Sequence, residues 1–247
     1  MNNKSKLDII DINKKRGLDM KYRFDGYGNP GWSFTPTRMR QLNSLFSYIE
    51  SIPSYKSFDY KGMQNVISDF DPNLDDSKLR MFFPWLKIYG VFNDYSQKIT
   101  YGQILTTLGR GFVEFTNIYI RSLDNSDDFS ESQLASISDT FHAFVNNFYY
   151  NLLDTDKWKL YKWTEEIVNE MNYLTFDEFF AITNAVKNDL DRSWIYETIQ
   201  TMRDYPETTE VEIISNKNAW GYVIPFLEEA GIVSMDKRVI YPVRGED

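Results

Sequence analysis

The chain has 247 residues, of which 42% are hydrophobic and 17% aromatic, and its formal net charge is −9 at pH 7. This length and apolar content suffice for one large core or two smaller ones. The sequence contains no cysteine, which excludes disulfides and thiolate chemistry and fits a reducing, cytoplasmic location. Its N-terminus holds no apolar run long enough for a signal peptide or a membrane span, so we expect a soluble protein without a membrane partner.

Charge is unevenly distributed along the chain. Residues 1–23 hold seven lysines and arginines against three aspartates, whereas Asn125–Ser132 is acidic. The acidic total disfavours a nucleic-acid partner, because binding to phosphates requires a basic footprint. Local clustering matters more than the total, however, and a basic face stays open as an interpretation. The aromatic residues are either core side chains or, where exposed, platforms on which bases stack.

The first part of the chain is expected to form a polar N-terminal arm over residues 1–31 and a first subdomain over residues 32–121. Apolar residues at helical spacing and a favourable first turn predict three helices in this subdomain, over residues 37–51, over residues 60–70 and from about Asp75. A two-stranded ribbon is predicted next, from Val91–Phe92 and residues 98–107. Helix then resumes at residue 108 and continues to about residue 121.

The second part begins with residues 122–157, which are expected to form a linker and a connecting helix, because Ser122–Ser132 is polar and the stretch beyond it is apolar. A second subdomain is expected over residues 158–247. Its helices are predicted from Trp158, from Thr175, over residues 191–206 and from near Ser215 to Gly231, with a hairpin over Ile232–Val243. Thr175 and Glu178 have the spacing of a capping box.

One unit recurs in the two subdomains. FFPWLKIYGVFNDYSQKITY and YVIPFLEEAGIVSMDKRVIY share a proline inside an apolar helix, a glycine, a polar turn and an apolar strand. Gly90 and Gly231 would let the chain turn sharply out of each helix. Three helices followed by a hairpin are typical of a winged helix. We therefore predict a mainly α fold with short β-hairpins, arranged as tandem winged-helix subdomains related to the helix-turn-helix.

Catalytic patterns are poor. The single histidine, His142, lies in an apolar run and is interpreted as a packed core residue. With one histidine and no cysteine, a zinc site of usual composition cannot form. Asp69 and the run Asp76-Ser77-Lys78 resemble the carboxylate–lysine set of metal-dependent nucleases, but we reject that reading because these residues precede or begin a predicted helix. We expect no catalytic site, metal or cofactor in this chain.

The winged-helix prediction supplies a candidate DNA surface, since the third helix of such a unit enters the major groove and the wing contacts phosphates. In the first subdomain this places Lys78, Arg80 and Lys87 near DNA on the third helix, with Lys98 and Arg110 on or just after the wing. In the second subdomain it places Asn216, Lys217 and Asn218 at the start of the last helix, with Lys237 and Arg238 on the wing. Asparagine suits adenine edges, and arginine or lysine suits guanine. The same residue types also serve as caps and solvated surface residues, so both interpretations stay open.

Two stretches carry a family resemblance. WSFTPTRMRQLNSLF followed by WLKIYGVFNDYSQKITYGQILTTLGRGF, and MNYLTFDEFFAITNAVKNDLDRSWIYETIQTMRDY followed by the last hairpin, resemble the N-terminal recognition region of AlwI-type type IIS restriction endonucleases and nicking endonucleases. The resemblance implies two winged-helix-like subdomains that read an asymmetric DNA site. It also implies that Trp32, Thr35 and Arg38 lie near DNA, and we include the neighbouring Arg40 among the candidate DNA-binding residues.

In that family a separate C-terminal, Mg²⁺-dependent nuclease domain cuts outside the recognised site. The sequence here holds no convincing nuclease motif before it ends at Asp247. The resemblance therefore implies a restriction-modification recognition part, with double-stranded DNA as one partner and a nuclease domain or subunit as another. Mg²⁺ is expected only for that missing nuclease domain.

Two functions follow from these patterns. The first is a sequence-specific double-stranded DNA recognition module without its own nuclease domain. The second is an acidic tandem winged-helix adaptor for protein interactions, similar to the acidic partners of bacterial condensin kleisins. The net charge of −9 and the many aromatic residues suit the adaptor. The repeated helix-plus-wing unit and its basic residues suit the DNA module.

Overall fold

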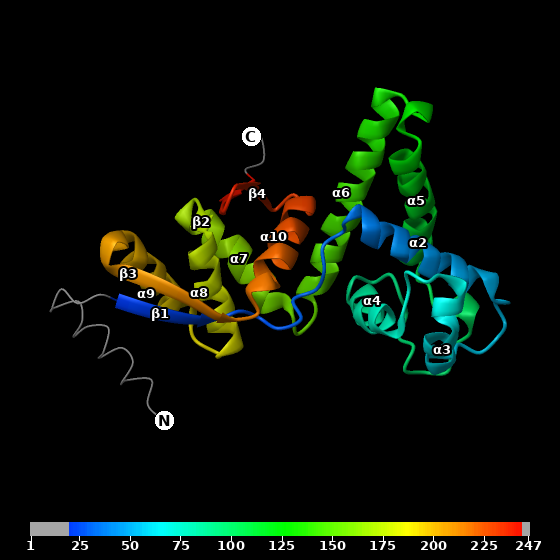
Figure 1. Ribbon diagram of the computed structural model, residues 1–247, viewed down its shortest axis with the longest axis horizontal. Helices are drawn as coiled ribbons and strands as arrows, with labels where there is room; N and C mark the ends of the chain where they lie inside the picture. Colours follow the sequence, from blue (N-terminus) through cyan, green and yellow to red (C-terminus); the bar gives the residue numbers. More distant parts are fainter. Residues whose placement is uncertain (1–19, 244–247) are drawn as a thin grey trace. The chain divides into compact units, whose positions relative to one another are not determined.

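The computed structural model describes residues 20–243 (Figure 1). Within that range the chain is mainly helical, with a few short strands in two small sheets, as the sequence predicts. It divides into two compact units. The aromatic-core unit comprises Gly31–Trp158 and Val223–Val233. The strand-pair unit comprises the described parts of Met1–Pro30, Lys159–Tyr222 and Ser234–Asp247.

Five helices make up most of the aromatic-core unit. They are α2 (Pro36–Ser51), α3 (Tyr60–Phe70), α4 (Asp76–Ile88), α5 (Thr107–Asp124) and α6 (Glu131–Leu153). The first three begin within two residues of their predicted starts, because each has a capping side chain in place. Thr35, Asp59 and Asp75 each accept a hydrogen bond from the backbone amide three residues further on.

Aromatic rings build the core of this unit. Phe34 is 5% exposed, and the centroid of its ring lies 4.6 Å from that of Trp32 and 5.8 Å from that of Phe148. Tyr89 stacks on Phe148 and on Phe226, with centroids 5.2 and 5.5 Å apart. These aromatic residues therefore serve as core, the first of the two roles expected from the composition.

The two-stranded ribbon predicted after α4 is not formed as continuous strands. Phe92 and Leu105 are joined by an isolated antiparallel bridge, and Thr100 forms another with Ser57, which precedes α3. A 3-10 turn over Tyr101–Gln103 follows Thr100 directly, and Thr100 and Gln103 form its capping box. The capping box bends the chain out of extended geometry, and this is why the predicted strand is wrong over most of its length.

The polar stretch Ser122–Ser132 connects two helices of one unit. It ends α5, passes through a 3-10 turn over Ser126–Asp128 and leads into α6, where Ser130 and Gln133 form a capping box. Both helices belong to the aromatic-core unit, and they pack on each other through rings such as Phe115 and Phe144. The segment 122–157, expected to be a linker with a connecting helix, thus lies in the same compact unit as the segment before it.

The strand-pair unit is named after β1 (Met20–Asp25) and β3 (Thr209–Ser215), which pair in parallel (Figure 1). Sequence analysis missed both strands and assigned Met20–Asp25 to a polar arm. The residues of β1 alternate, with Tyr22 and Phe24 buried and Lys21 and Arg23 exposed. This period-two pattern is the strand signal that the analysis overlooked. The remaining basic residues of the predicted arm lie outside the described residues.

The rest of this unit consists of helices and a small sheet. Its elements are α7 (Trp158–Met171), β2 (Leu174–Thr175), α8 (Phe176–Lys187), α9 (Arg192–Asp204), β4 (Val233–Asp236) and β5 (Val239–Pro242), with β2, β5 and β4 in that order in one sheet. The three helices confirm their predicted positions. The capping box of Thr175 and Glu178 at the start of α8 is also confirmed.

Two helices, α4 and α10 (Trp220–Glu229), end in the same way. Each is followed by a glycine of positive φ, 73° at Gly90 and 72° at Gly231. Beyond each glycine, the next amide donates to the carbonyl five residues back, from Val91 to Leu86 and from Ile232 to Leu227. These are Schellman helix ends, and the sharp turns predicted at the two glycines are confirmed.

Alanine at the two glycines should have unequal effects. Gly231→Ala is expected to cost about 1 kcal/mol of unfolding free energy, because the added Cβ meets no atom within 4 Å and only the left-handed backbone is strained. Gly90→Ala should cost about 2 kcal/mol, because its Cβ would lie 2.6 Å from Nδ2 of Asn151, which donates to the Tyr89 carbonyl. Urea unfolding measures both. If the two variants lose the same unfolding free energy, the Asn151 side chain can move away from the added Cβ and still keep its hydrogen bond to the Tyr89 carbonyl.

Among residues 20–243, none of the helices combines the length and the apolar character that crossing a bilayer requires.

Candidate nucleic-acid interface

Helix α4 presents the candidate DNA face of the aromatic-core unit. Its inner side is buried through residues such as Leu79, Phe82 and Leu86. Its outer side exposes Arg80 and Lys87, which lie seven residues apart and therefore project from nearly the same side of the helix. The predicted third helix thus has a buried apolar face and an exposed face with two cations.

Both cations on this face are paired with aspartates. Nη2 of Arg80 lies 2.9 Å from Oδ2 of Asp76, one turn earlier on α4. Nζ of Lys87 lies 2.8 Å from Oδ1 of Asp94, which follows the end of the helix. The Lys87 ammonium group, followed by the Ser96 amide, lowers the pKa of Asp94 to about 2, so Asp94 is ionised at every pH near neutrality. The face therefore consists of two ion pairs rather than two open cations.

The N-terminus of α4 is also closed to a phosphate group. Oδ1 of Asp75 accepts hydrogen bonds from the Lys78 amide at 2.8 Å and from the Ser77 hydroxyl at 2.5 Å. The Ser77 hydroxyl and then the Lys78 amide lower the pKa of Asp75. A carboxylate thus occupies the position at which a helix N-terminus would bind an anion. Lys78 contributes its amide to this cap, and its side chain is half-buried.

The other predicted residues of this unit take different positions. Arg40 on α2 forms an ion pair of 2.6 Å with Asp124. Arg110, in the first turn of α5, donates weakly to the Gly102 carbonyl at 3.4 Å. Lys98 is exposed between α4 and α5. Of these three cations, one is therefore neutralised by an aspartate.

The residues that the family resemblance places near DNA have structural roles here. Trp32 is 1% exposed and belongs to the aromatic core. Thr35 caps α2 by accepting from the Arg38 amide. The Arg38 side chain donates through Nη1 to the carbonyl and the hydroxyl of Ser33, both at 3.0 Å, and so fixes the chain that enters α2.

In the second repeat, α10 carries no lysine or arginine, and of its ten residues only Gly221 is exposed. Its apolar residues Val223, Ile224, Phe226 and Leu227 are all buried. The half-buried residues of the helix are Trp220, Tyr222, Pro225, Glu228 and Glu229, so its accessible surface is small and holds no cation. The expectation that this helix, the last of the second subdomain, enters a DNA groove stays a prediction, and most of its side chains serve the core.

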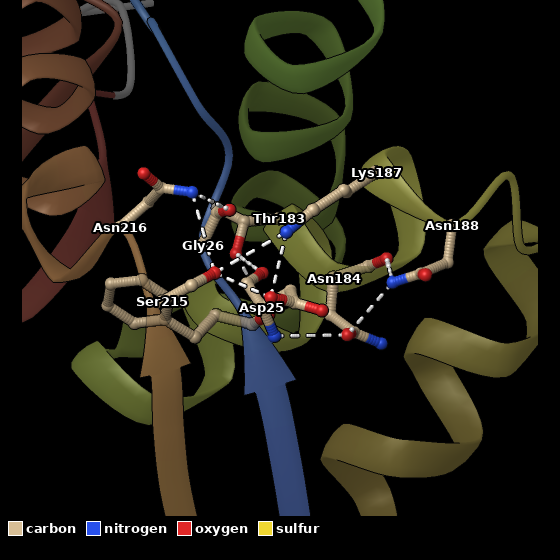
Figure 2. Close-up of polar contacts among 9 residues, drawn as sticks. Asp25, Gly26, Thr183, Asn184, Lys187, Asn188, Ser215 and Asn216 are labelled. Carbon is tan, nitrogen blue, oxygen red and sulfur yellow. Dashed lines mark hydrogen bonds and ion pairs between the residues drawn. The ribbon is translucent and has the colours of Figure 1, made fainter.

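Asn216 belongs to a polar cluster at the carboxyl ends of β1 and β3 (Figure 2). It adopts a left-handed conformation with φ of 46°, and its Nδ2 donates to the Gly26 carbonyl at 3.1 Å. Gly26 in turn donates through its amide to the Ser215 carbonyl at 3.0 Å. The Asn216 amide, expected at an adenine edge, is engaged in closing the strand pair. Lys217 and Asn218 follow it, exposed, in a 3-10 turn.

Asp25 is the centre of the same cluster. Its Oδ1 lies 2.8 Å from Nζ of Lys187 on α8 and accepts from the Ser215 hydroxyl at 2.5 Å. Lys187 and then Ser215 lower the pKa of Asp25. Its amide donates to Oδ1 of Asn184, and its carbonyl accepts from the Thr183 hydroxyl (Figure 2). The cluster anchors the strand ends to α8, and its polar groups are satisfied from within.

The turn between β4 and β5 holds the last two predicted cations. Lys237 is exposed and has a φ of 58°. The guanidinium of Arg238 lies 4.0 Å from the ring centroid of Phe176, and the Arg238 carbonyl accepts from the Phe176 amide. Arg238 therefore holds the turn against the start of α8, and both cations are exposed.

The sequence analysis misjudged the burial of His142 and missed the aspartates that pair with the cations of α4. His142 is exposed rather than packed in the core, and its Nδ1 lies 2.9 Å from the carbonyl oxygen of Glu229, at the end of α10. Asp76 and Asp94 were not recognised as partners of the cations on α4. The four-residue spacing of Asp76 and Arg80 is a helical ion-pair signal that the sequence does contain.

A second region that the sequence analysis missed lies beside α8 and α9. A depression of about 350 Å³ there is lined by Tyr173, Thr175, Asp177, Glu178, Met202, Arg203, Pro206, Thr209 and Val211. Glu178 and Arg203 form a buried ion pair in its wall, with Nε of Arg203 2.6 Å from Oε1 of Glu178. Arg203 also lies 3.9 Å from the ring centroid of Tyr173. Glu178 and Arg203 therefore neutralise each other, whereas burial raises the pKa of the third charged lining residue, Asp177.

Within the ranges that the structure describes, no three carboxylate or imidazole side chains gather as metal ligands would. Comparisons with family models, curated proteins and solved structures found no match for this chain.

Proposed function

We propose that the chain is a sequence-specific double-stranded DNA recognition module, of the kind that the resemblance to AlwI-type endonucleases implies, and that it works with a nuclease domain or subunit. In this proposal each repeat is a winged helix, and α4 is the helix that enters the major groove. The second repeat, with its buried α10, supports the first rather than reading the groove itself.

The observation that carries the proposal is a repeated pairing pattern. In each repeat, a helix ends at a glycine in the left-handed conformation. The chain then turns back, and a residue of the returning segment pairs in antiparallel fashion with a residue that precedes an earlier helix of the same repeat. The pairs are Thr100 with Ser57, ahead of α3, and Ile240 with Leu174, ahead of α8. In this proposal the returning segment is the wing, which pairs through an isolated bridge in the first repeat and through β2 and β5 in the second.

The first test is selection from a random-sequence duplex library at two salt concentrations. A DNA module should enrich one short asymmetric motif and bind more weakly as the salt rises. Arg80→Ala and Lys87→Ala should then each weaken binding and lower the slope of log affinity against log salt by about 1. Lys159→Ala is the matched control, because Lys159 is also paired with an aspartate, Asp189, but lies in the strand-pair unit.

If no motif is enriched and both variants bind as the parent does, the DNA proposal is wrong. The second candidate, the acidic protein-interaction adaptor, is favoured by one observation: Arg40, Arg80 and Lys87 are each neutralised by an aspartate. An adaptor of this kind should bind a protein partner in a manner insensitive to salt and should show no affinity for duplex DNA.

A further inference from the structure

We propose that Asp76 and Asp94 restrain sequence-independent DNA binding by competing with phosphate groups for the two cations of α4. This inference rests on the proposed function and concerns the same face. A cation that is already paired with an aspartate binds phosphate groups more weakly, whatever the DNA sequence. The two aspartates would therefore lower non-specific binding and so increase specificity.

The competition follows from the placement of the pairs. Arg80 and Asp76 lie near the start of the exposed face of α4, and Lys87 and Asp94 lie at its end. The side chains of Arg80 and Lys87 are 66% and 45% exposed, and those of both aspartates are 43% exposed. All four groups are therefore accessible to a duplex laid on this helix, and the cations cannot approach a phosphate without bringing an aspartate close to it.

Each aspartate is fixed by a second contact. Asp76 accepts a hydrogen bond from the Gln64 side chain on the preceding helix, α3. Asp94 accepts from the Ser96 amide at 3.1 Å through the same Oδ1 atom that binds Lys87. These contacts keep the carboxylates beside the cations. A carboxylate that could rotate away would compete less effectively with DNA.

A phosphate arriving at α4 meets three obstacles. It must displace a carboxylate from the cation, it is repelled by that carboxylate, and it finds the helix N-terminus already capped by Asp75. Solvent screens exposed ion pairs such as these, so each pair should change a binding constant by roughly fivefold at most. The restraint is thus modest for each pair and acts on all DNA sequences alike.

The experiment measures affinity for one random-sequence duplex across a range of salt concentrations, using the full chain and the variants Asp76→Asn and Asp94→Asn. Each variant is expected to bind roughly fivefold more tightly than the parent at low salt, with a salt slope steeper by about 1. Asparagine keeps the size of the side chain and can still accept a hydrogen bond. Circular dichroism melting checks that both variants fold.

Asp139→Asn is the matched control. Asp139 is exposed on α6, and no cation pairs with it among the described residues, so the variant makes the same change in net charge without releasing a cation. Its affinity should stay within about twofold of the parent at physiological salt, because the change releases no cation and exposed charges are screened there.

The outcomes separate the two proposals. Tighter binding by Asp76→Asn or Asp94→Asn, but not by Asp139→Asn, supports the inference, even if the parent itself binds too weakly to measure. Equal binding by the parent and all variants overturns the inference and leaves the proposed function standing. Absence of binding by the parent and every variant at low salt overturns both.

Discussion

Replacing Phe34 with alanine should lower the free energy of unfolding by about 3–5 kcal/mol. The ring is 5% exposed and contacts rings contributed by four other segments of the aromatic-core unit. Its neighbours in the core include Trp32, Tyr89, Phe112, Phe141, Phe148 and Phe226. Alanine would remove contacts to all of them at once and leave a cavity that rigid rings cannot fill by small movements.

Urea unfolding followed by circular dichroism measures this loss. Tyr55→Ala serves as the control, because Tyr55 is an aromatic residue of the same unit that is 84% exposed, and its removal should change stability by no more than about 0.5 kcal/mol. If Phe34→Ala cost as little as the control, the described aromatic core would be wrong.

The second large effect is expected at the buried ion pair of the strand-pair unit. Glu178→Ala should cost about 3–5 kcal/mol, because it leaves the Arg203 guanidinium without its counter-charge. The side chains of Glu178 and Arg203 are only 3% and 20% exposed. The same substitution removes the acceptor of the Thr175 amide, which donates to Oε2 of Glu178 at 2.7 Å. Urea unfolding gives the cost.

A double variant distinguishes loss of the pair from loss of packing. Glu178→Leu combined with Arg203→Met replaces both charges by apolar side chains, and it should be more stable than Glu178→Leu alone. If the double variant loses at least as much unfolding free energy as the two single variants lose together, the two charges do not stabilise each other.

Features set by neighbouring residues were predictable from the sequence. Capping signals at Asp75 and at Thr175 located the starts of α4 and α8, because a cap contacts amides only two or three residues further on. The ends of α4 and α10 followed from Gly90 and Gly231 for the same reason. The mainly helical class rests on these local signals.

Features that depend on distant residues were not predictable. Lys87 and Asp94 are only seven positions apart, but their pairing depends on the course of the chain after α4, which is held by a residue further along: the Asn93 amide donates to the Ile104 carbonyl. The burial of α10 likewise depends on rings such as Tyr89, far away in the sequence. The candidate DNA-facing residues therefore stay a prediction, and the sequence did not show that Arg80 and Lys87 are paired with aspartates.

The parallel pairing of β1 with β3 constrains how the protein is made. Lys21 and its partner Glu210 are separated by 189 positions. At 5–20 residues per second, a ribosome needs roughly 10–40 s to travel from one to the other. During that interval Tyr22 and Phe24 have no strand to pair with. We therefore expect nascent chains stalled before residue 209 to leave this segment open to chaperones and proteases, and chains released after residue 215 to protect it.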